Sequence, residues 1–334
     1  MRRFLAAFLS SLMLSALLVQ PNGLARESVQ IETPLLKFAA FSDTHVMDAW
    51  NIDPYKRTHK FTHALRDIKA FQPDFLVING DLSNGREQDL KRLKSILKAN
   101  GNYRLFPSMG NHEYYYQWEN SKWNDEKAKA QFQQMFGLKQ LYYDHFEKGA
   151  HFIHLSPEQY MPMQKQIGEA AWLSDKQIEW FEKTLLASQA PTFVFLHQPL
   201  DNTVGKTDPG VSAVQTEKLL AIAKRHPQVV WFSGHSHVSV TSPTEVVEKE
   251  GITFVGLGSV YQPIELVKKR SVGEANQGES SFRVDQFKSE SRFVTLYRDR
   301  IVIRARLHHN NSWGDQHVIR LKRQKAVDKR LSTA

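Results

Sequence analysis

Short apolar segments that end in polar clusters constrain this chain more than any other feature of its sequence. Five of these segments are bounded by turn-forming residues and have the length of buried strands. They are Leu36–Phe41, Phe75–Ile78, Leu105–Ser108, Thr192–Leu196 and Val229–Phe232. Helical patterns separate several of them, so the first two thirds of the chain are predicted to consist of strand–helix units.

The helical patterns are defined by their spacing and by their end signals. Apolar residues recur at i, i+3, i+4 and i+7 between Phe61 and Ile68 and again between Leu90 and Leu97, where Gly101 is a plausible stop. A capping-box sequence at Ser174 predicts the start of a helix that runs through Leu186. A further helix is expected over Asp125–Phe136.

The final third of the chain has a different pattern. Ile252–Leu257, Phe293–Tyr297 and Ile301–Leu307 are predicted strands without helices between them, and a hairpin turn is expected around Asp299. Strand–helix units followed by antiparallel strands favour two sheets packed together with helices outside, in a single domain.

Polar residues cluster where the first five strands end. In open α/β sheets ligands bind outside the carboxyl ends of the strands, so these residues are expected to meet at one edge. Side chains two positions apart share a face of an extended segment, which pairs Asp43 with His45 and His235 with His237. The five clusters are Ser42–His45, Asn79–Asp81, Gly110–Glu113, His197–Pro199 and Gly234–His237.

The chemistry of these residues points to metal ions. The chain has no cysteine, which excludes disulfides, cysteine-ligated zinc, iron–sulfur clusters and thiol nucleophiles. Seven Asp, Asn and His residues are more than one tetrahedral zinc can use, so they favour two ions, and their mixed donors suit Mn, Fe, Zn, Co or Ni. Two such ions can activate a shared water and clamp an in-line phosphoryl displacement. The candidate ligands are Asp43, His45, Asp81, Asn111, His197, His235 and His237.

In combination, the five clusters resemble those of the calcineurin-like metallophosphoesterase superfamily, from about Leu36 to Trp313. The resemblance implies an α/β fold in which two mixed β-sheets pack as a sandwich with flanking helices. It also implies a hydrolase acting on phosphoric ester bonds, in which His112 is catalytic and stabilises the transition state or protonates the leaving oxygen. Asp43, His45, Asp81 and His237 would bind one metal, and Asp81 (bridging), Asn111, His197 and His235 the other.

The sequence departs from the family pattern in two places. Asn84 stands where many members have an aspartate that supports the catalytic histidine. Asn84 can hydrogen-bond an imidazole but cannot stabilise an imidazolium with charge, although Glu113 or another carboxylate could substitute. The cluster that contains Asp81 also lacks the tyrosine ligand of purple acid phosphatases, which disfavours a ferric enzyme.

An aromatic run follows the third cluster and has two interpretations. Tyr114 and Tyr115, with Tyr116, Trp118 and Trp123, could line the cleft and bind substrate, or they could pack a lid segment onto the domain. Packing of a lid segment onto the domain is the favoured interpretation. Nine other histidines lie outside the clusters and are expected to be mostly ordinary surface or core residues.

The N-terminus has the pattern of a secretory signal peptide. Arg2 and Arg3 precede the apolar run Phe4–Val19, and Gly23-Leu24-Ala25 is a small-x-small cleavage site. We expect a signal peptide over residues 1–25, a metallophosphoesterase domain over 35–313 and export to the periplasm or beyond. An uncleaved membrane anchor and a buried core helix are the alternatives.

The net charge of +9 is concentrated near the C-terminus. Six basic residues lie between Arg320 and Arg330, in a basic tail predicted over residues 314–334. This tail could touch an anionic envelope surface weakly or simply be solvated. A nucleic-acid partner is therefore not expected, and a small phosphate ester is the expected substrate.

These observations predict an exported dinuclear metal-dependent phosphoesterase. It would hydrolyse phosphate mono- or diesters by in-line attack of a metal-bridging hydroxide. A nuclease or a cyclic-nucleotide phosphodiesterase of the same fold is the alternative within enzymes. A non-catalytic metal- or anion-binding module is the alternative from another class.

Overall fold

The computed structural model describes residues 32–48, 56–205, 210–268 and 280–322. The predicted signal peptide, residues 1–25, and residues 323–334 of the predicted tail lie outside this part. Within it, no helix combines the length and apolar character needed to cross a membrane.

The first of two six-stranded sheets holds three of the polar clusters. Its parallel strands are β1 (Leu36–Phe41), β2 (Phe75–Asn79) and β3 (Leu105–Ser108). Three antiparallel strands continue the sheet beyond β1, in the order β12, β13 and β14. Their bounds are Glu290–Leu296, Arg300–Leu307 and Ser312–Arg320.

The second sheet holds the other two clusters. Its order is β4-β5-β6-β7-β9-β8, with β5, β6, β7 and β9 parallel and an antiparallel strand at each edge. The bounds are β4 Tyr143–Glu147, β5 Ala150–His154, β6 Thr192–Phe195, β7 Val229–Ser233, β8 Val246–Lys249 and β9 Ile252–Gly256. A separate two-stranded ribbon pairs β10 (Ile264–Lys268) with β11 (Ser280–Val284).

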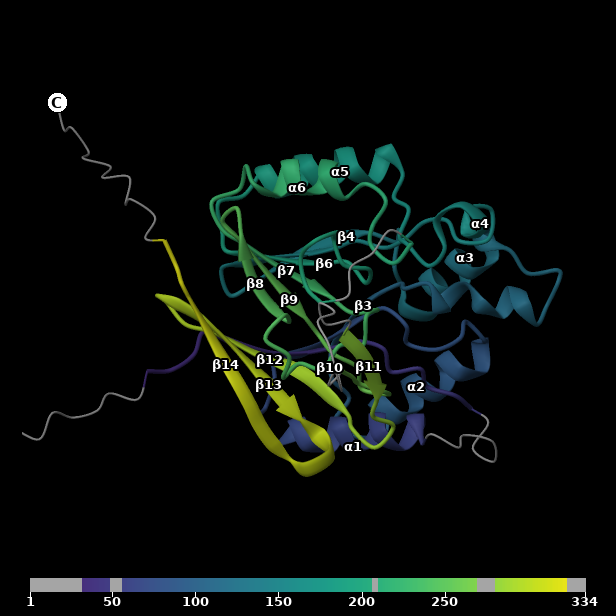
Figure 1. Ribbon diagram of the computed structural model, residues 1–334, viewed down its shortest axis with the longest axis horizontal. Helices are drawn as coiled ribbons and strands as arrows, with labels where there is room; N and C mark the ends of the chain where they lie inside the picture. The colour runs from purple at the N-terminus through teal and green to yellow at the C-terminus, as the bar shows by residue number, and fades with distance from the viewer. Residues whose placement is uncertain (1–31, 49–55, 206–209, 269–279, 323–334) are drawn as a thin grey trace, which may run out of the picture. The chain divides into compact units, whose positions relative to one another are not determined.

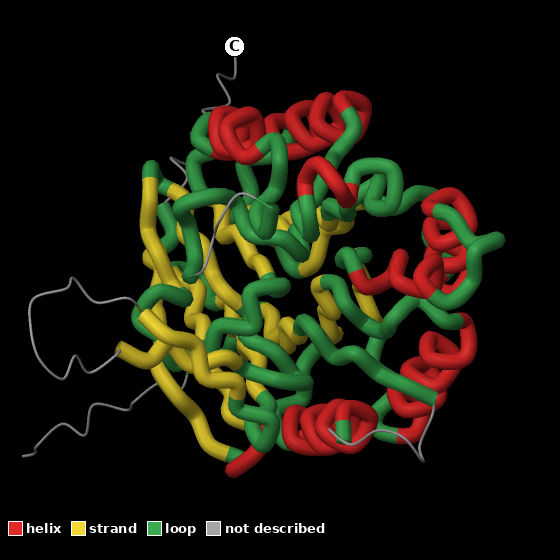
Figure 2. Tube along the Cα trace, turned by 45° about the vertical axis from the view of Figure 1, so that its right-hand side comes forward, coloured by secondary structure: helices red, strands yellow, loops and turns green. Residues whose placement is uncertain are grey.

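Helices cover the outer faces of both sheets (Figures 1 and 2). The first sheet is covered by α1, α2 and α3, and the second by α5 and α6. The α-helices are α1 (Arg57–Lys69), α2 (Glu87–Ala99), α3 (Asp125–Phe136), α4 (Gln164–Ile167), α5 (Asp175–Leu186) and α6 (Thr216–Ala223). Two 3-10 helices are η1 (His112–Trp118) and η2 (His308–Asn310).

The alternation of side chains along each strand builds the layers. In β1, Phe38 and Ala40 face the second sheet, whereas Ala39 and Phe41 face the helices. Aromatic rings fill the space between the sheets; the Phe38 ring centre lies 5.3 Å from that of Phe75 and 5.3 Å from that of Phe193. Because apolar residues fill both faces of the central strands, polar groups gather where these strands end.

Most predicted elements agree with the structure. Helix α3 matches its predicted bounds, and α5 begins directly after Ser174, whose hydroxyl caps the helix by accepting a hydrogen bond from the backbone N–H of Gln177 at 3.2 Å. The hairpin turn around Asp299 joins β12 to β13. The two packed sheets with helices outside confirm the predicted fold class.

Three features of the fold differ from the predicted elements. The strand at Ile252–Gly256 pairs in parallel with β7 in the second sheet, instead of joining the antiparallel strands at the chain's end. Strands β4, β5 and β8 and helix α6 have no counterpart in the prediction. Strand β14 runs to Arg320, so the folded sheet continues past Trp313 into the residues predicted as tail.

Candidate metal centre

The ends of the two sheets are joined by one buried asparagine. The Asn79 side-chain amide, at the end of β2, donates to the carbonyls of Leu196 at 3.1 Å and Phe232 at 3.2 Å, at the ends of β6 and β7. The hydroxyl of Ser42 donates to the Asn79 carbonyl at 2.8 Å. These bonds hold the polar clusters of both sheets against one another.

One group of candidate ligands combines Asp43, His45 and His237. The ligand atoms of these three residues all lie within 4.8 Å of one another. His237 Nε2 lies 2.9 Å from Asp43 Oδ1 and 3.4 Å from His45 Nε2. Asp43 and His45 are buried and His237 is half-buried, so this group is largely shielded from solvent.

A second group combines Asp81, His197 and His235, again within 4.8 Å. Asp81 Oδ2 lies 3.1 Å from His197 Nε2 and 3.9 Å from His45 Nε2. Its carboxylate therefore stands between the two groups. The same atom is 3.8 Å from His112 Nε2, so His45, Asp81 and His112 form a third such trio.

Hydrogen bonds to carbonyl groups orient two of the imidazoles. His197 Nδ1 donates to the Asn79 carbonyl at 2.7 Å, and His237 Nδ1 donates to the Gln262 carbonyl at 2.9 Å. A carbonyl can only accept, so these bonds place the proton of each neutral ring on Nδ1. When these rings are neutral, as in a metal ligand, Nε2 is the atom that offers a lone pair.

Two buried atoms at the centre lack hydrogen bonds despite close neighbours. Among the described residues, no hydrogen bond of acceptable geometry reaches Asp43 Oδ1 or His197 Nε2. Their nearest charged neighbours are nevertheless only 2.9 Å and 3.1 Å away. Buried polar atoms normally have partners, so lone pairs that converge without bonding one another fit the ligand sphere of a cation.

The electrostatics of the centre favour ionised carboxylates. Burial by itself would raise the pKa of Asp43, but the charges of His237 and His197 lower it to about 2. Burial likewise opposes the protonated form of His197, yet Asp81 and Asp43 raise its pKa to about 9. Burial lowers the pKa of His235 to about 3. Two ionised carboxylates in one buried site attract cations.

Five candidate ligands have a strained backbone. The φ angles of Asp43, His45, Asp81, His235 and His237 lie between 44° and 63°, the left-handed region that residues with a Cβ rarely adopt. Such conformations cost about 1–3 kcal/mol each and persist where the surrounding structure imposes them. These strained residues lie together at the strand ends. The surrounding structure therefore holds the backbone in an unfavourable conformation that positions the candidate ligands.

Glycines allow the clusters to approach one another. A Cβ added to Gly110 would lie 2.3 Å from Asp81 Oδ1, and one added to Gly234 would lie 2.7 Å from Asp43 Oδ2. A side chain at either position would therefore have to displace a candidate ligand.

Comparison with known proteins identifies this arrangement. A sequence model of the calcineurin-like phosphoesterases matches residues 36–239, which contain all seven candidate ligands. The chain belongs to the calcineurin-like phosphoesterase family. This membership confirms the predicted enzyme class, phosphoester hydrolysis, and the family uses divalent metal ions. A search of curated protein sequences finds no match.

Solved structures share the phosphoesterase fold at low sequence identity. A dimetal phosphatase from zebrafish (Danio rerio) is 15% identical, with a TM-score of 0.62 over 86% of this chain and 99% of that one. The purple acid phosphatase PPD1 from yellow lupin (Lupinus luteus) is 15% identical, with a TM-score of 0.58 over 86% and 55%. GAP50 of Plasmodium, an anchor in its inner membrane complex, is 16% identical, with a TM-score of 0.56 over 87% and 90%.

Asn111 is held by a carboxylate that sequence reasoning missed. The Asn111 amide nitrogen donates to Glu169 Oε2 at 2.7 Å, and the hydroxyls of Tyr115 and Tyr160 donate to the same carboxylate at 2.9 Å each. With its nitrogen bound in this way, the amide leaves its oxygen for other partners. No strand-end motif contains Glu169, so only the packed structure identifies it.

His112 lies at the edge of the centre on helix η1. Its Nδ1 is 2.8 Å from Asn84 Oδ1, so the neutral amide at this position does bond the imidazole. Glu113 does not take the place of the missing aspartate. Its carboxylate instead accepts four backbone N–H groups, from residues 81, 82, 83 and 110, at 2.7–3.2 Å, and so clamps the loops that carry Asp81 and Asn111.

The two candidate substrate-binding tyrosines have different surroundings. Tyr114 is 0% exposed, packs in the core below the first sheet and donates to the Pro157 carbonyl at 2.8 Å. Its ring offers no face to a substrate, which corrects the expectation for this residue. The Tyr115 ring lies beside the metal centre, 3.9 Å from the ring centre of His112, and substrate contact by Tyr115 stays a prediction.

Proposed function

We propose that this phosphoesterase is exported, binds two divalent metal ions and hydrolyses phosphate monoesters or diesters. The observation that carries the proposal is the position of Asp81. Its carboxylate lies between the group of Asp43, His45 and His237 and the pair of His197 and His235. A carboxylate between two ligand sets can bridge two cations.

The residues present fit such ions. The donors are carboxylate oxygens, an amide oxygen and imidazole nitrogens, a mixture that suits Mn, Fe, Zn, Co or Ni. Two of them, Asp43 Oδ1 and His197 Nε2, are buried without a hydrogen bond from any described residue. We assign Asp43, His45, Asp81 and His237 to one ion, and Asp81, Asn111, His197 and His235 to the other.

Two cations at this centre would polarise a phosphoryl oxygen and lower the pKa of a water molecule. The chain's own residues then orient the substrate and handle the proton of the leaving group. His112 is anchored through Nδ1 on Asn84, and its Nε2 lies 3.8 Å from Asp81 Oδ2. A neutral ring in this tautomer has no proton on Nε2, so donation to a leaving oxygen requires the protonated ring, which burial disfavours by lowering the pKa of His112. Because Asn84 carries no charge, we expect aryl phosphates to react faster than alkyl phosphates.

The proposal of export is supported by the sequence pattern of residues 1–25. Arg2 and Arg3, the apolar run Phe4–Val19 and a small-x-small triplet at Gly23–Ala25 have the order of a cleavable signal peptide. N-terminal sequencing of the protein from fractionated cells decides the matter. A mature chain that starts after Ala25 supports export, and a membrane-bound chain that retains Met1 favours the anchor.

The decisive test of the proposed catalysis substitutes the bridging residue. The protein is reconstituted with each candidate metal, and its metal content and turnover of aryl monoester, aryl diester, cyclic nucleotide and phospholipid substrates are measured. Asp81→Asn should lower kcat/KM on the order of 10³-fold or more and reduce the bound metal. Asp175→Asn, the same chemical change at an exposed position on α5, should leave both unchanged. Full activity and metal content in Asp81→Asn would refute the two-metal proposal.

A further inference from the structure

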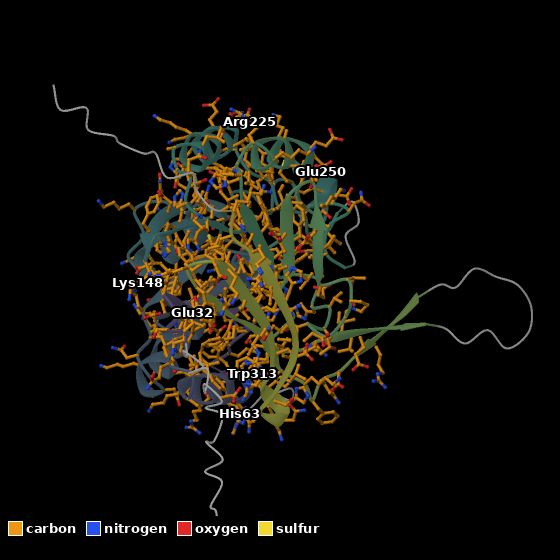
Figure 3. All side chains as sticks on the ribbon, turned by 90° about the vertical axis from the view of Figure 1, so that its left-hand side faces the viewer. Glu32, His63, Lys148, Arg225, Glu250 and Trp313 are labelled. Atoms are coloured by element: carbon orange, nitrogen blue, oxygen red, sulfur yellow. The ribbon has the colours of Figure 1, made fainter. Side chains whose placement is uncertain are left out.

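A pocket of about 330 Å³ opens beside the start of helix α1, outside the set of candidate ligands. One wall is formed by Lys56, the residue before α1, and by His59, Lys60 and His63 of α1. His59 and Lys60 lie four and three residues before His63, so these three side chains share one helix face. The other wall is formed by Gln286, Phe287, Ser289 and His309. Figure 3 shows His63 at the end of the molecule where α1 approaches the last strands.

The lining of this pocket is basic. Two lysines and three histidines line it, and no acidic residue is among the described lining residues. The nearby carboxylates are bonded elsewhere: Asp67 bonds Arg306 and His308, Glu265 bonds Lys288 and Arg283, and Glu290 bonds Ser239. The first turn of α1 also lacks an acidic residue. The Lys56 and Lys60 ammonium groups make this concave site electropositive, and such a site attracts anions.

The pocket lies one aromatic ring away from the metal centre. The Lys60 ammonium donates to the Tyr261 carbonyl and lies 5.7 Å from the centre of the Tyr261 ring. The same ring makes an edge contact with His45, with ring centres 5.3 Å apart. These two distances together place the ammonium within about 11 Å of the His45 ring.

Tyr261 is fixed in this position by the backbone of the metal centre. Its backbone N–H donates to the Asp43 carbonyl at 3.1 Å, and the preceding residue, Val260, donates to the Ser42 carbonyl at 3.2 Å. The Arg57 guanidinium lies 4.7 Å from the Tyr261 ring centre and adds a further positive charge on this side. Tyr261 therefore contacts Lys60 of the pocket wall while its backbone bonds the loop that carries Asp43.

We propose that this pocket binds a second phosphate group of the substrate, so that the preferred substrates carry two phosphates on a sugar-sized skeleton. The inference rests on the proposed function, because the first phosphate is the one hydrolysed at the metal centre. Lysine and histidine side chains can form charge-assisted hydrogen bonds to the distal phosphate. Phe287, 81% exposed at the rim, offers an apolar face to the skeleton that joins the two groups.

The test compares two sugar phosphates that differ only in a second phosphate at the far end. Introduction of a negative charge by Lys56→Glu or His63→Glu should lower kcat/KM for the bisphosphate about tenfold, mainly through KM, since a lost charge-assisted contact is of this size. The monophosphate should react at an unchanged rate. Lys176→Glu, the same change as Lys56→Glu at an exposed position on α5, is the matched control and should affect neither substrate.

A second measurement does not depend on turnover. Metal is first removed from the protein with a chelator. Inorganic phosphate is then titrated into this protein while the histidine ring protons are followed by NMR. The resonances of His59, His63 and His309, assigned from single substitutions, should shift together, and Lys56→Glu should weaken the shift. Unchanged resonances overturn the pocket as a phosphate site whatever the activity.

The outcomes separate this inference from the proposed function. Equal efficiency on both substrates, insensitive to Lys56→Glu and His63→Glu, overturns the substrate preference and leaves the phosphoesterase proposal standing. Failure of the metal-loaded protein to hydrolyse either substrate or the aryl esters overturns the proposed function, and the preference falls with it. Phosphate binding at the three histidines without a preference for the bisphosphate also overturns the substrate assignment.

Discussion

Substitution of Gly110 by alanine perturbs the metal centre without removing any ligand. The backbone of Gly110 is outside the left-handed region, so alanine is compatible with its conformation. Its new Cβ would lie 2.3 Å from Asp81 Oδ1 and 2.6 Å from His197 Cδ2. Ordinary contacts require about 3.5 Å, so the Asp81 carboxylate must retreat by roughly 1 Å.

The magnitude follows from that displacement. A shift of about 1 Å in a group that positions the reacting atoms lowers the rate about 100-fold, which corresponds to about 2.7 kcal/mol of transition-state stabilisation. Crowding of a packed site lowers the free energy of unfolding by about 1–3 kcal/mol. We therefore expect Gly110→Ala to fold, to lose bound metal and to lose about two orders of magnitude in kcat/KM on an aryl phosphate.

The assay measures kcat/KM, metal content and the free energy of unfolding in the same preparation. The control is Gly137→Ala at the end of α3, where φ is 68° and no atom lies within 4 Å of the added Cβ. This control should lose about 1 kcal/mol of stability through its left-handed backbone and keep full activity. Wild-type metal content and kcat/KM in Gly110→Ala would refute the idea that this close approach positions Asp81.

Three further substitutions test residues outside the set of candidate ligands. Tyr114→Phe removes the bond to the Pro157 carbonyl and should lower the free energy of unfolding by about 1 kcal/mol with no change in relative rates among substrates; altered substrate preference would contradict its core role. Glu169→Gln should weaken binding of one metal about 10–100-fold, seen by metal titration, because Asn111 loses its charged anchor; unchanged metal affinity would argue against this positioning role. Burial lowers the pKa of His145 to about 3, so the folded state resists its protonation and loses about 2 kcal/mol of stability between pH 7 and pH 5. His145→Phe should remove that part of the acid sensitivity, measured as urea midpoints at the two pH values, and an unaltered pH dependence would count against it.

Much of the site was predictable because its residues follow strands directly. An apolar run that ends in a polar cluster fixes which side chains emerge at the sheet edge, and a two-residue spacing fixes that Asp43 and His45 emerge together. Two of the strands that the prediction missed, β4 and β8, are edge strands. Each of them contains exposed and charged residues, so they lack the continuous apolar pattern of the central strands.

The supporting residues were not predictable from local patterns. Glu169 lies far along the chain from Asn111, and no spacing rule connects an isolated glutamate to a strand end. Tyr114 and Tyr115 are adjacent in sequence, yet helix η1 turns one ring into the core and the other toward His112. Which of two neighbouring rings faces the site depends on that turn, and the turn is set by packing.

The sequence by itself determined the chemistry of this protein: a cysteine-free set of Asp, Asn and His residues at five strand ends, in the order of a phosphoesterase. Local spacing is enough for that, because each cluster is contiguous and its strand is recognisable. Only the tertiary structure decided that Asn79 joins the two sheets, that Glu169 holds Asn111, and that a basic pocket forms between the start of α1 and residues 286–309. These relationships join residues distant in the chain, and packing, not sequence spacing, brings such residues into contact.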